Sequence, residues 1–147
     1  MGFPPATPRP GLVIRYSYLW HNESRRGRDE GVKDRPCAVL LAVADVSGKT
    51  RVLTLPITHR PPDIQSHGVE IPAATKRRLG LDDARSWIIL SEGNRFTWPG
   101  PDLRPLKSAD AASVAYGELP QVLFEAVRVK WLALYALQKI KITARTE

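Results

Sequence analysis

The chain has 147 residues and a formal net charge of +7; 43% of its residues are hydrophobic and 25% are charged. This length fits one domain that can bury a core without disulfides, and these fractions exclude wholesale disorder. The positive charge leaves three kinds of acidic partner open: nucleic acid, an acidic protein segment and a membrane surface.

Cysteine use and hydropathy narrow the class further. Cys37 is the only cysteine, which excludes an intrachain disulfide and a multi-cysteine zinc site, so we expect it to pack in the core. The N-terminal stretch MGFPPATPRPG lacks the apolar segment of a signal peptide, and no apolar run approaches the roughly 20 residues that span a bilayer. We therefore expect a soluble, cytoplasmic protein that does not bind a membrane.

The first quarter of the chain predicts an arm, a strand and a loop. Residues 1–10 hold four prolines and predict an N-terminal arm. Residues 12–20 predict a strand, and residues 21–34 a long charged loop. Alternation places four side chains of this strand on one face: Ile14, Tyr16, Tyr18 and Trp20.

A hairpin is predicted next. Residues 37–44 form a continuous apolar run, typical of a strand that is buried on both faces or wrapped into a small barrel. The turn residues VSGK separate it from residues 50–58, which return with Leu53, Leu55 and Ile57 inward. Pro56 lacks a backbone donor, so this second strand should lie at an edge or near its own end at Pro56.

The rest of the chain alternates short strands with helices. Short strands are predicted at residues 69–72, 86–92 and 95–98, and a short helix at 73–80. Ser108 can begin a short alanine-rich helical turn that Gly117 ends. Pro120 opens a helix to about Ile140 that is apolar over more than half its circumference, so it either covers the sheet or also packs on a second subunit.

This order of elements predicts an α+β fold with a small, bent antiparallel sheet. We expect one domain over residues 1–147, with an arm at 1–10, a strand-rich body at 11–104 and a helical C-terminal extension at 105–147.

Three polar residues gather at the ends of the two hairpin strands. Arg35 precedes Pro36, which restricts it to an extended geometry, and a fixed guanidinium suits the oxygens of a phosphate. If the two strands form one hairpin, Thr58 lies beside Arg35 and its hydroxyl can bind the same phosphoryl group. The alternatives are that Arg35 pairs with Asp34 or Glu30, and that Thr58 only ends its strand.

His59 is the candidate proton carrier, because histidine titrates near neutral pH. Strand alternation points its side chain away from that of Thr58, so it can join the site only if the chain bends before Pro61 and Pro62. The alternative is a loop histidine without a role.

Basic and aromatic residues suggest a path for a single nucleic-acid strand. They are Trp20 at the root of the charged loop, Arg25, Arg26, Arg28 and Lys33 within it, Arg60, and the helical cluster of Lys76 and Arg77 with Arg78. The alternative is a solvated charge run, since the carboxylates of the loop nearly balance its cations.

Several segments in this order resemble the MazF/PemK family of bacterial toxins. They are PGLVIRYSYLW, KDRPCAVLLA, VLTLPIT and GLDDARSWIILSEGN, and they span roughly residues 11–104. The family carries RP at the head of its second strand and PIT or PIS at the end of its third, which here are Arg35-Pro36 and Pro56-Ile57-Thr58. The ending WPGPDLRP and the longer C-terminal part depart from the family pattern.

The resemblance implies an SH3-like barrel, usually dimeric, that cleaves single-stranded RNA without a metal or another cofactor. The 2′-hydroxyl attacks the adjacent phosphorus and leaves a cyclic phosphate. The resemblance gives Arg35 the stabilisation of the phosphorane charge and Thr58 a contact to the phosphate, with Glu23 as a candidate carboxylate from the first loop. It also implies an antitoxin partner with an acidic tail.

Two other functions remain open. A gyrase poison of the CcdB type uses the same barrel to bind a protein and cuts nothing. A non-catalytic SH3-like module would bind RNA or DNA through charge alone.

Overall fold

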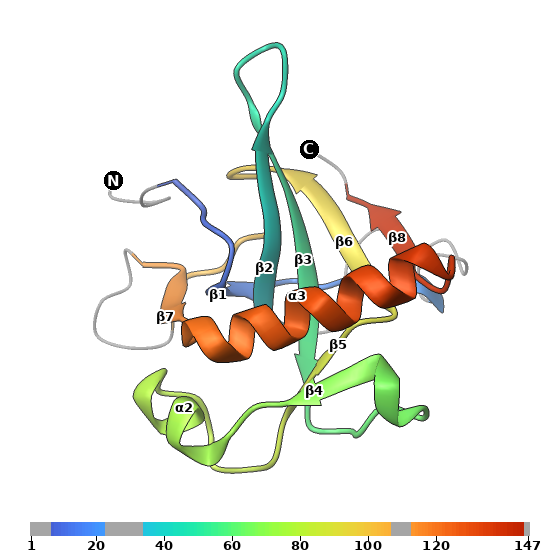
Figure 1. Cartoon of the computed structure of the whole chain (residues 1–147). Helices are drawn as coiled ribbons and strands as arrows, with labels where there is room; N and C mark the ends of the chain where they lie inside the picture. Colours follow the sequence, from blue (N-terminus) through green and yellow to red (C-terminus); the bar gives the residue numbers. More distant parts are fainter. Residues whose placement is uncertain (1–6, 23–33, 107–112, 146–147) are drawn as a thin grey trace.

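The computed structural model describes residues 7–22, 34–106 and 113–145, which form an α+β fold around one sheet (Figure 1). The strands are β1 Leu12–Tyr16, β2 Arg35–Ala44, β3 Thr50–Thr58, β4 Gly68–Glu70, β5 Trp87–Ile89, β6 Glu92–Thr97, β7 Ala115–Glu118 and β8 Lys141–Ala144. The helices are the 3₁₀ turn η1 Gln65–His67, α2 Ala73–Arg78 and α3 Gln121–Ala136.

The sheet has the order β4-β5-β3-β2-β1-β7; β6 also pairs with β3, and β8 pairs with β6. Every pairing is antiparallel except that of β8 with β6. The predicted α+β class and antiparallel sheet are confirmed. Among the strands that the structure describes, the pairings do not close into a ring.

Strand alternation divides the core between the two faces of the sheet. On β2, Ala38 and Leu40 belong to the cluster that includes residues of α3, whereas Cys37 and Val39 belong to the cluster on the opposite face. Burial on both faces therefore holds for the first half of β2 only. From Leu41 outward the side chains of β2 are mostly exposed, while β3 stays paired with β6 as far as Arg51. The turn of the β2–β3 hairpin extends beyond the rest of the sheet in Figure 1.

The placement of β3 in the centre of the sheet corrects one alternative from the sequence. Its first half pairs with β6 and its last two residues pair with β5, while β2 covers its other side. Pro56 is therefore not on an edge strand. It lies two residues before the strand ends, where the partner changes from β6 to β5 and a missing donor is tolerated.

The C-terminal quarter differs from its prediction at both ends. The segment that was expected to be a helical turn ending at Gly117 contains β7, which pairs with β1 instead. The long helix ends at Ala136, because Gln138 adopts a left-handed φ of 58°, and the following segment forms β8. Both strands depend on partners far away in the sequence, which local helix propensity does not reveal.

Helix α3 lies across the face of β2, β3 and β6 in Figure 1. It buries one stripe, Val127, Trp131 and Leu134, against the sheet. Its outer side exposes four large apolar residues: Val122, Val129, Leu132 and Tyr135. The helices in the described ranges include none long and apolar enough to cross a membrane.

We predict that Trp131→Ala lowers the free energy of unfolding by about 3–5 kcal/mol, because this indole is only 5% exposed and its loss leaves a cavity under α3. Urea unfolding followed by circular dichroism measures the change. Val122→Ala on the outer side, where the residue is 85% exposed, serves as the control and should change stability by less than about 0.5 kcal/mol. Equal effects of the two variants would contradict the packing of α3.

Candidate functional site

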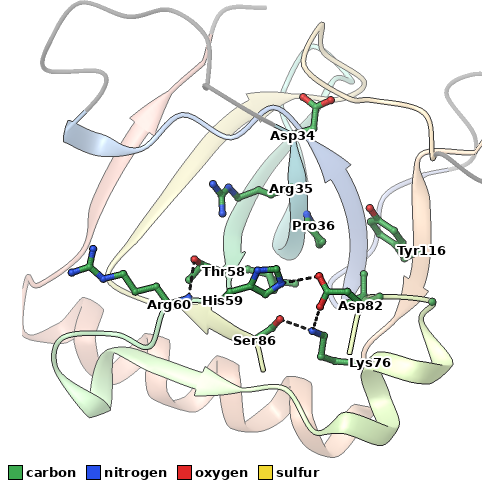
Figure 2. Close-up of a pocket in the computed structure, with 13 residues that line it drawn as sticks. Asp34, Arg35, Pro36, Thr58, His59, Arg60, Lys76, Asp82, Ser86 and Tyr116 are labelled. Carbon is green, nitrogen blue, oxygen red and sulfur yellow. Dashed lines mark hydrogen bonds and ion pairs between the residues drawn. The ribbon is translucent and has the colours of Figure 1, made fainter. Parts of the chain in front are cut away.

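A cavity of about 440 Å³ opens where β2 begins and β3 ends (Figure 2). Arg35 enters it from β2, Thr58 and His59 from the end of β3, Lys76 from α2, and Asp82 from the loop before β5. With Arg60 at its rim, it therefore gathers five of the residues predicted for the site and adds an aspartate.

The strand register explains why Arg35 and Thr58 meet. Cys37 pairs with Pro56 and Ala38 with Leu55, and continuing this antiparallel register by two residues sets Arg35 opposite Thr58. Both residues line the cavity, and neither faces a packed interior. The two residues therefore lie on adjacent strands and line one cavity, as the hairpin predicts.

The guanidinium of Arg35 has no carboxylate partner among the residues that the structure describes. Asp34, one of the two alternative partners, instead lies 3.3 Å from Arg15 and 3.6 Å from Arg104; the other, Glu30, lies outside the described residues. The Nε of Arg35 is buried without a hydrogen-bond acceptor within the described ranges. Its guanidinium carbon lies 5.1 Å from the ring centre of Trp20, a distance typical of a cation–π contact. The charge is thus held in place but not neutralised there.

Thr58 is half-buried and still able to donate. Its Oγ1 accepts a 3.3 Å hydrogen bond from the backbone N–H of Arg60, which leaves the hydroxyl hydrogen available to a ligand. This contact between residues two positions apart marks a bend directly after β3. The bend turns His59 into the same cavity, so the condition set for His59 is met.

His59 begins a chain of polar contacts that reaches into the protein (Figure 2). Its Nε2 lies 2.8 Å from Oδ2 of Asp82, and Oδ1 of Asp82 accepts a 2.7 Å hydrogen bond from Nζ of Lys76. The hydrogen bond from Lys76 holds the pKa of Asp82 below its ordinary value, and the contact with His59 adds to this. Asp82 therefore stays ionised as the pH falls, and the contacts are lost only when the pH passes its lowered pKa.

The sequence suggested that Lys76 belongs to a basic cluster on the surface of a helix, but the structure buries its side chain. It is 3% exposed, and its ammonium also donates to the hydroxyl of Ser86, at 2.6 Å, and to the carbonyl of Ala84. It reaches a ligand only from inside the cavity. Arg77 is exposed and lies outside this cavity, and Arg78 donates to the carbonyl of Glu118.

Arg60 and Trp20 both line a second cavity next to this one. Arg60 is 83% exposed, lines the cavity, and makes a loose contact of 3.8 Å with Asp63. Trp20 lines a neighbouring cavity that shares Thr58 and Arg60 with the first. Five of the predicted residues fall outside the described residues: Glu23, Arg25, Arg26, Arg28 and Lys33.

Sequence reasoning missed three cavity residues: Asp82, Ser86 and Tyr116. Asp82 and Ser86 stand in GLDDARSW, a segment noted for its resemblance but not for its chemistry. Burial raises the pKa of Tyr116, so its hydroxyl remains a neutral donor. No local pattern marks Tyr116, because it arrives on β7 through a long-range pairing.

The charges of the cavity favour an anion. Asp82 is matched by Lys76, and Asp34 by arginines other than Arg35, so the charge of Arg35 remains uncompensated within the described part of the chain. Arg60 adds a second cation at the rim. Within the same ranges, His, Cys, Asp and Glu do not gather in a group of three that could hold a metal ion. A guanidinium, a hydroxyl and an imidazole around one space can bind a phosphate group and move a proton beside it.

Comparison with known proteins adds no family: no family model matches the chain, and neither does any curated protein sequence.

We predict that Lys76→Met lowers the free energy of unfolding by about 2 kcal/mol or more, because it leaves Asp82 and the Ser86 hydroxyl without their buried donor. Arg77→Met, one position along α2 and exposed, is the matched control and should change stability by less than about 0.5 kcal/mol. Chemical unfolding of both variants measures the difference. If Lys76→Met is as stable as Arg77→Met, the ammonium does not hold this loop.

Proposed function

We propose that the protein is an endoribonuclease of the MazF/PemK type, a toxin that cleaves single-stranded RNA. The observation that carries the proposal is the guanidinium of Arg35, uncompensated by any described carboxylate, opposite the hydroxyl of Thr58 in one cavity. The motifs that carry Arg35 and Thr58 are also those on which the resemblance to that family rests.

The first step is attack of a ribose 2′-hydroxyl on the adjacent phosphorus. His59 accepts the proton of this hydroxyl, and Asp82 orients the imidazole and stabilises the imidazolium that forms. The bond from phosphorus to O5′ breaks and leaves a 2′,3′-cyclic phosphate. O5′ takes a proton from water, and the hydroxide so formed takes the proton from His59. The resemblance implies that no metal takes part.

Arg35 and Thr58 act on the phosphorane. Negative charge grows on its non-bridging oxygens, and a fixed cation beside them stabilises the transition state more than the ground state. The contact with Trp20 limits the motion of the guanidinium, which favours this preorganisation. The hydroxyl of Thr58 stays protonated near pH 7 and therefore cannot act as the base. It donates a hydrogen bond to the phosphate instead.

The bent antiparallel sheet supports an SH3-like architecture for this chain, as an open barrel in which the described strands do not pair into a closed sheet. The partners proposed with it are a second copy of the chain and an antitoxin whose acidic tail neutralises the basic site. Exposed apolar residues on α3 favour the alternative of a protein-binding toxin of the gyrase-poison type. A non-catalytic nucleic-acid-binding module remains the third candidate, on charge alone.

We predict that Arg35→Ala raises the barrier for RNA cleavage by about 2 kcal/mol or more, which lowers kcat/KM about 30-fold or more. Cleavage of a labelled single-stranded RNA under single-turnover conditions measures it. Arg95→Ala removes an equal charge from an exposed position on β6 and should cleave at nearly the wild-type rate. Unchanged cleavage by Arg35→Ala would exclude this mechanism.

A second prediction concerns the pH–rate profile. His59→Ala should remove the acidic limb of the profile, since that limb reports protonation of the base. Asp82→Asn should lower kcat/KM, because the amide no longer orients His59 or stabilises the imidazolium that forms 2.8 Å away. An acidic limb that persists in His59→Ala would show that another group carries the proton.

A further inference from the structure

A second cavity, of about 400 Å³, adjoins the first on the side of Arg60. The two share Thr58 and Arg60, so a phosphate bound at Thr58 would lie at the entrance to both. The volume is at the small end of the range of ligand cavities, about 300–1,000 Å³. A group attached directly to the phosphate can therefore reach the second cavity.

Its lining is largely apolar. The apolar residues are Trp20, the Pro61-Pro62 segment, Ile64 and Ile89 of β5. Ile64 is 54% exposed, so a large apolar side chain stands open to solvent at this point. An indole ring and apolar side chains suit the face of an aromatic ring, and every nucleobase presents one.

These walls are held in place by packing and backbone hydrogen bonds. A Cβ at Gly68 would lie 2.7 Å from Cγ of Pro62, so the two residues are in close contact. His67 donates its backbone N–H to the carbonyl of Ile64, at 2.8 Å, and accepts one from Leu90, also at 2.8 Å. The cavity is thus formed without a ligand, which reduces the entropic cost of binding.

Polar groups stand among these walls. Asp63, His67 and Ser91 line the cavity and offer acceptors and donors to the edge of a ring. An apolar slot with a few polar groups is the arrangement that orients a heterocyclic ligand.

We propose that this second cavity binds the base of the nucleotide on the 3′ side of the cleaved phosphate. The inference rests on the proposed function, because it places the phosphate at Arg35 and Thr58. In an in-line displacement the attacking and leaving oxygens lie on opposite sides of phosphorus. His59, which takes the proton of the attacking 2′-hydroxyl, lines the first cavity only, so the leaving nucleoside extends toward the second.

The test uses mononucleotides, which need no knowledge of the cleaved sequence. A nucleoside 5′-monophosphate mimics the 3′ side, and a nucleoside 3′-monophosphate mimics the 5′ side. We expect at least one of the four 5′-monophosphates to bind about 10-fold more tightly than ribose 5-phosphate, which lacks the base, in NMR titrations. Ile64→Ala should reduce this ratio toward one and leave the affinity for 3′-monophosphates unchanged.

Val46→Ala truncates a fully exposed aliphatic residue on the distant hairpin and should keep the wild-type ratio. The inference is overturned if the base adds no affinity, if Ile64→Ala keeps the ratio, or if the variant instead weakens the 3′-monophosphates. Failure of the proposed function has a different result: RNA remains uncut, or Arg35→Ala leaves the affinity for ribose 5-phosphate unchanged. If the protein cleaves RNA but the base adds no affinity, the proposed function stands and only the assignment of the second cavity as a base-binding site is excluded.

Discussion

The candidate chemistry depends on the register of β2 and β3. The two strands pair from their hairpin turn to Cys37 and Pro56, and this register sets Arg35 opposite Thr58 at the far end. A shift of one residue would turn one of the two side chains to the opposite face of the sheet. The alternating burial of Cys37, Ala38, Val39 and their partners on β3 fixes the register, because each face has its own core. Core packing therefore sets the geometry of the site.

The rest of the site follows from how β3 ends. The bend after Thr58 brings His59 into the cavity, and the adjoining Pro61-Pro62 segment forms a wall of its neighbour. Lys76, buried beneath, holds Asp82 in reach of His59. Lys76 thus supports Asp82, which contacts the imidazole of His59, and the charge of Arg35 stays uncompensated among the described residues.

The sequence predicts the parts of the fold and of the site that depend on local patterns of residues. Alternation and apolar runs indicated β1 to β6, and turn residues indicated the hairpin that places Arg35 and Thr58 on adjacent strands. Lys76 was misjudged because its neighbours Arg77 and Arg78 made it look solvated, and only the fold supplies the acceptors that bury it. β7 and β8 were missed because their partners, β1 and β6, lie about 100 and 50 residues earlier in the chain.

The central claim is that a ribose-linked phosphate binds between Arg35 and Thr58 and is attacked by its own 2′-hydroxyl. The most direct measurement is analysis of the ends produced when the purified protein is incubated with a single-stranded RNA of mixed sequence. The account predicts 2′,3′-cyclic phosphate and 5′-hydroxyl ends, and no cut at a position where a 2′-deoxynucleotide replaces the attacking ribose. Ends with 3′-hydroxyl and 5′-phosphate, or cleavage that persists at the deoxy position, would contradict it.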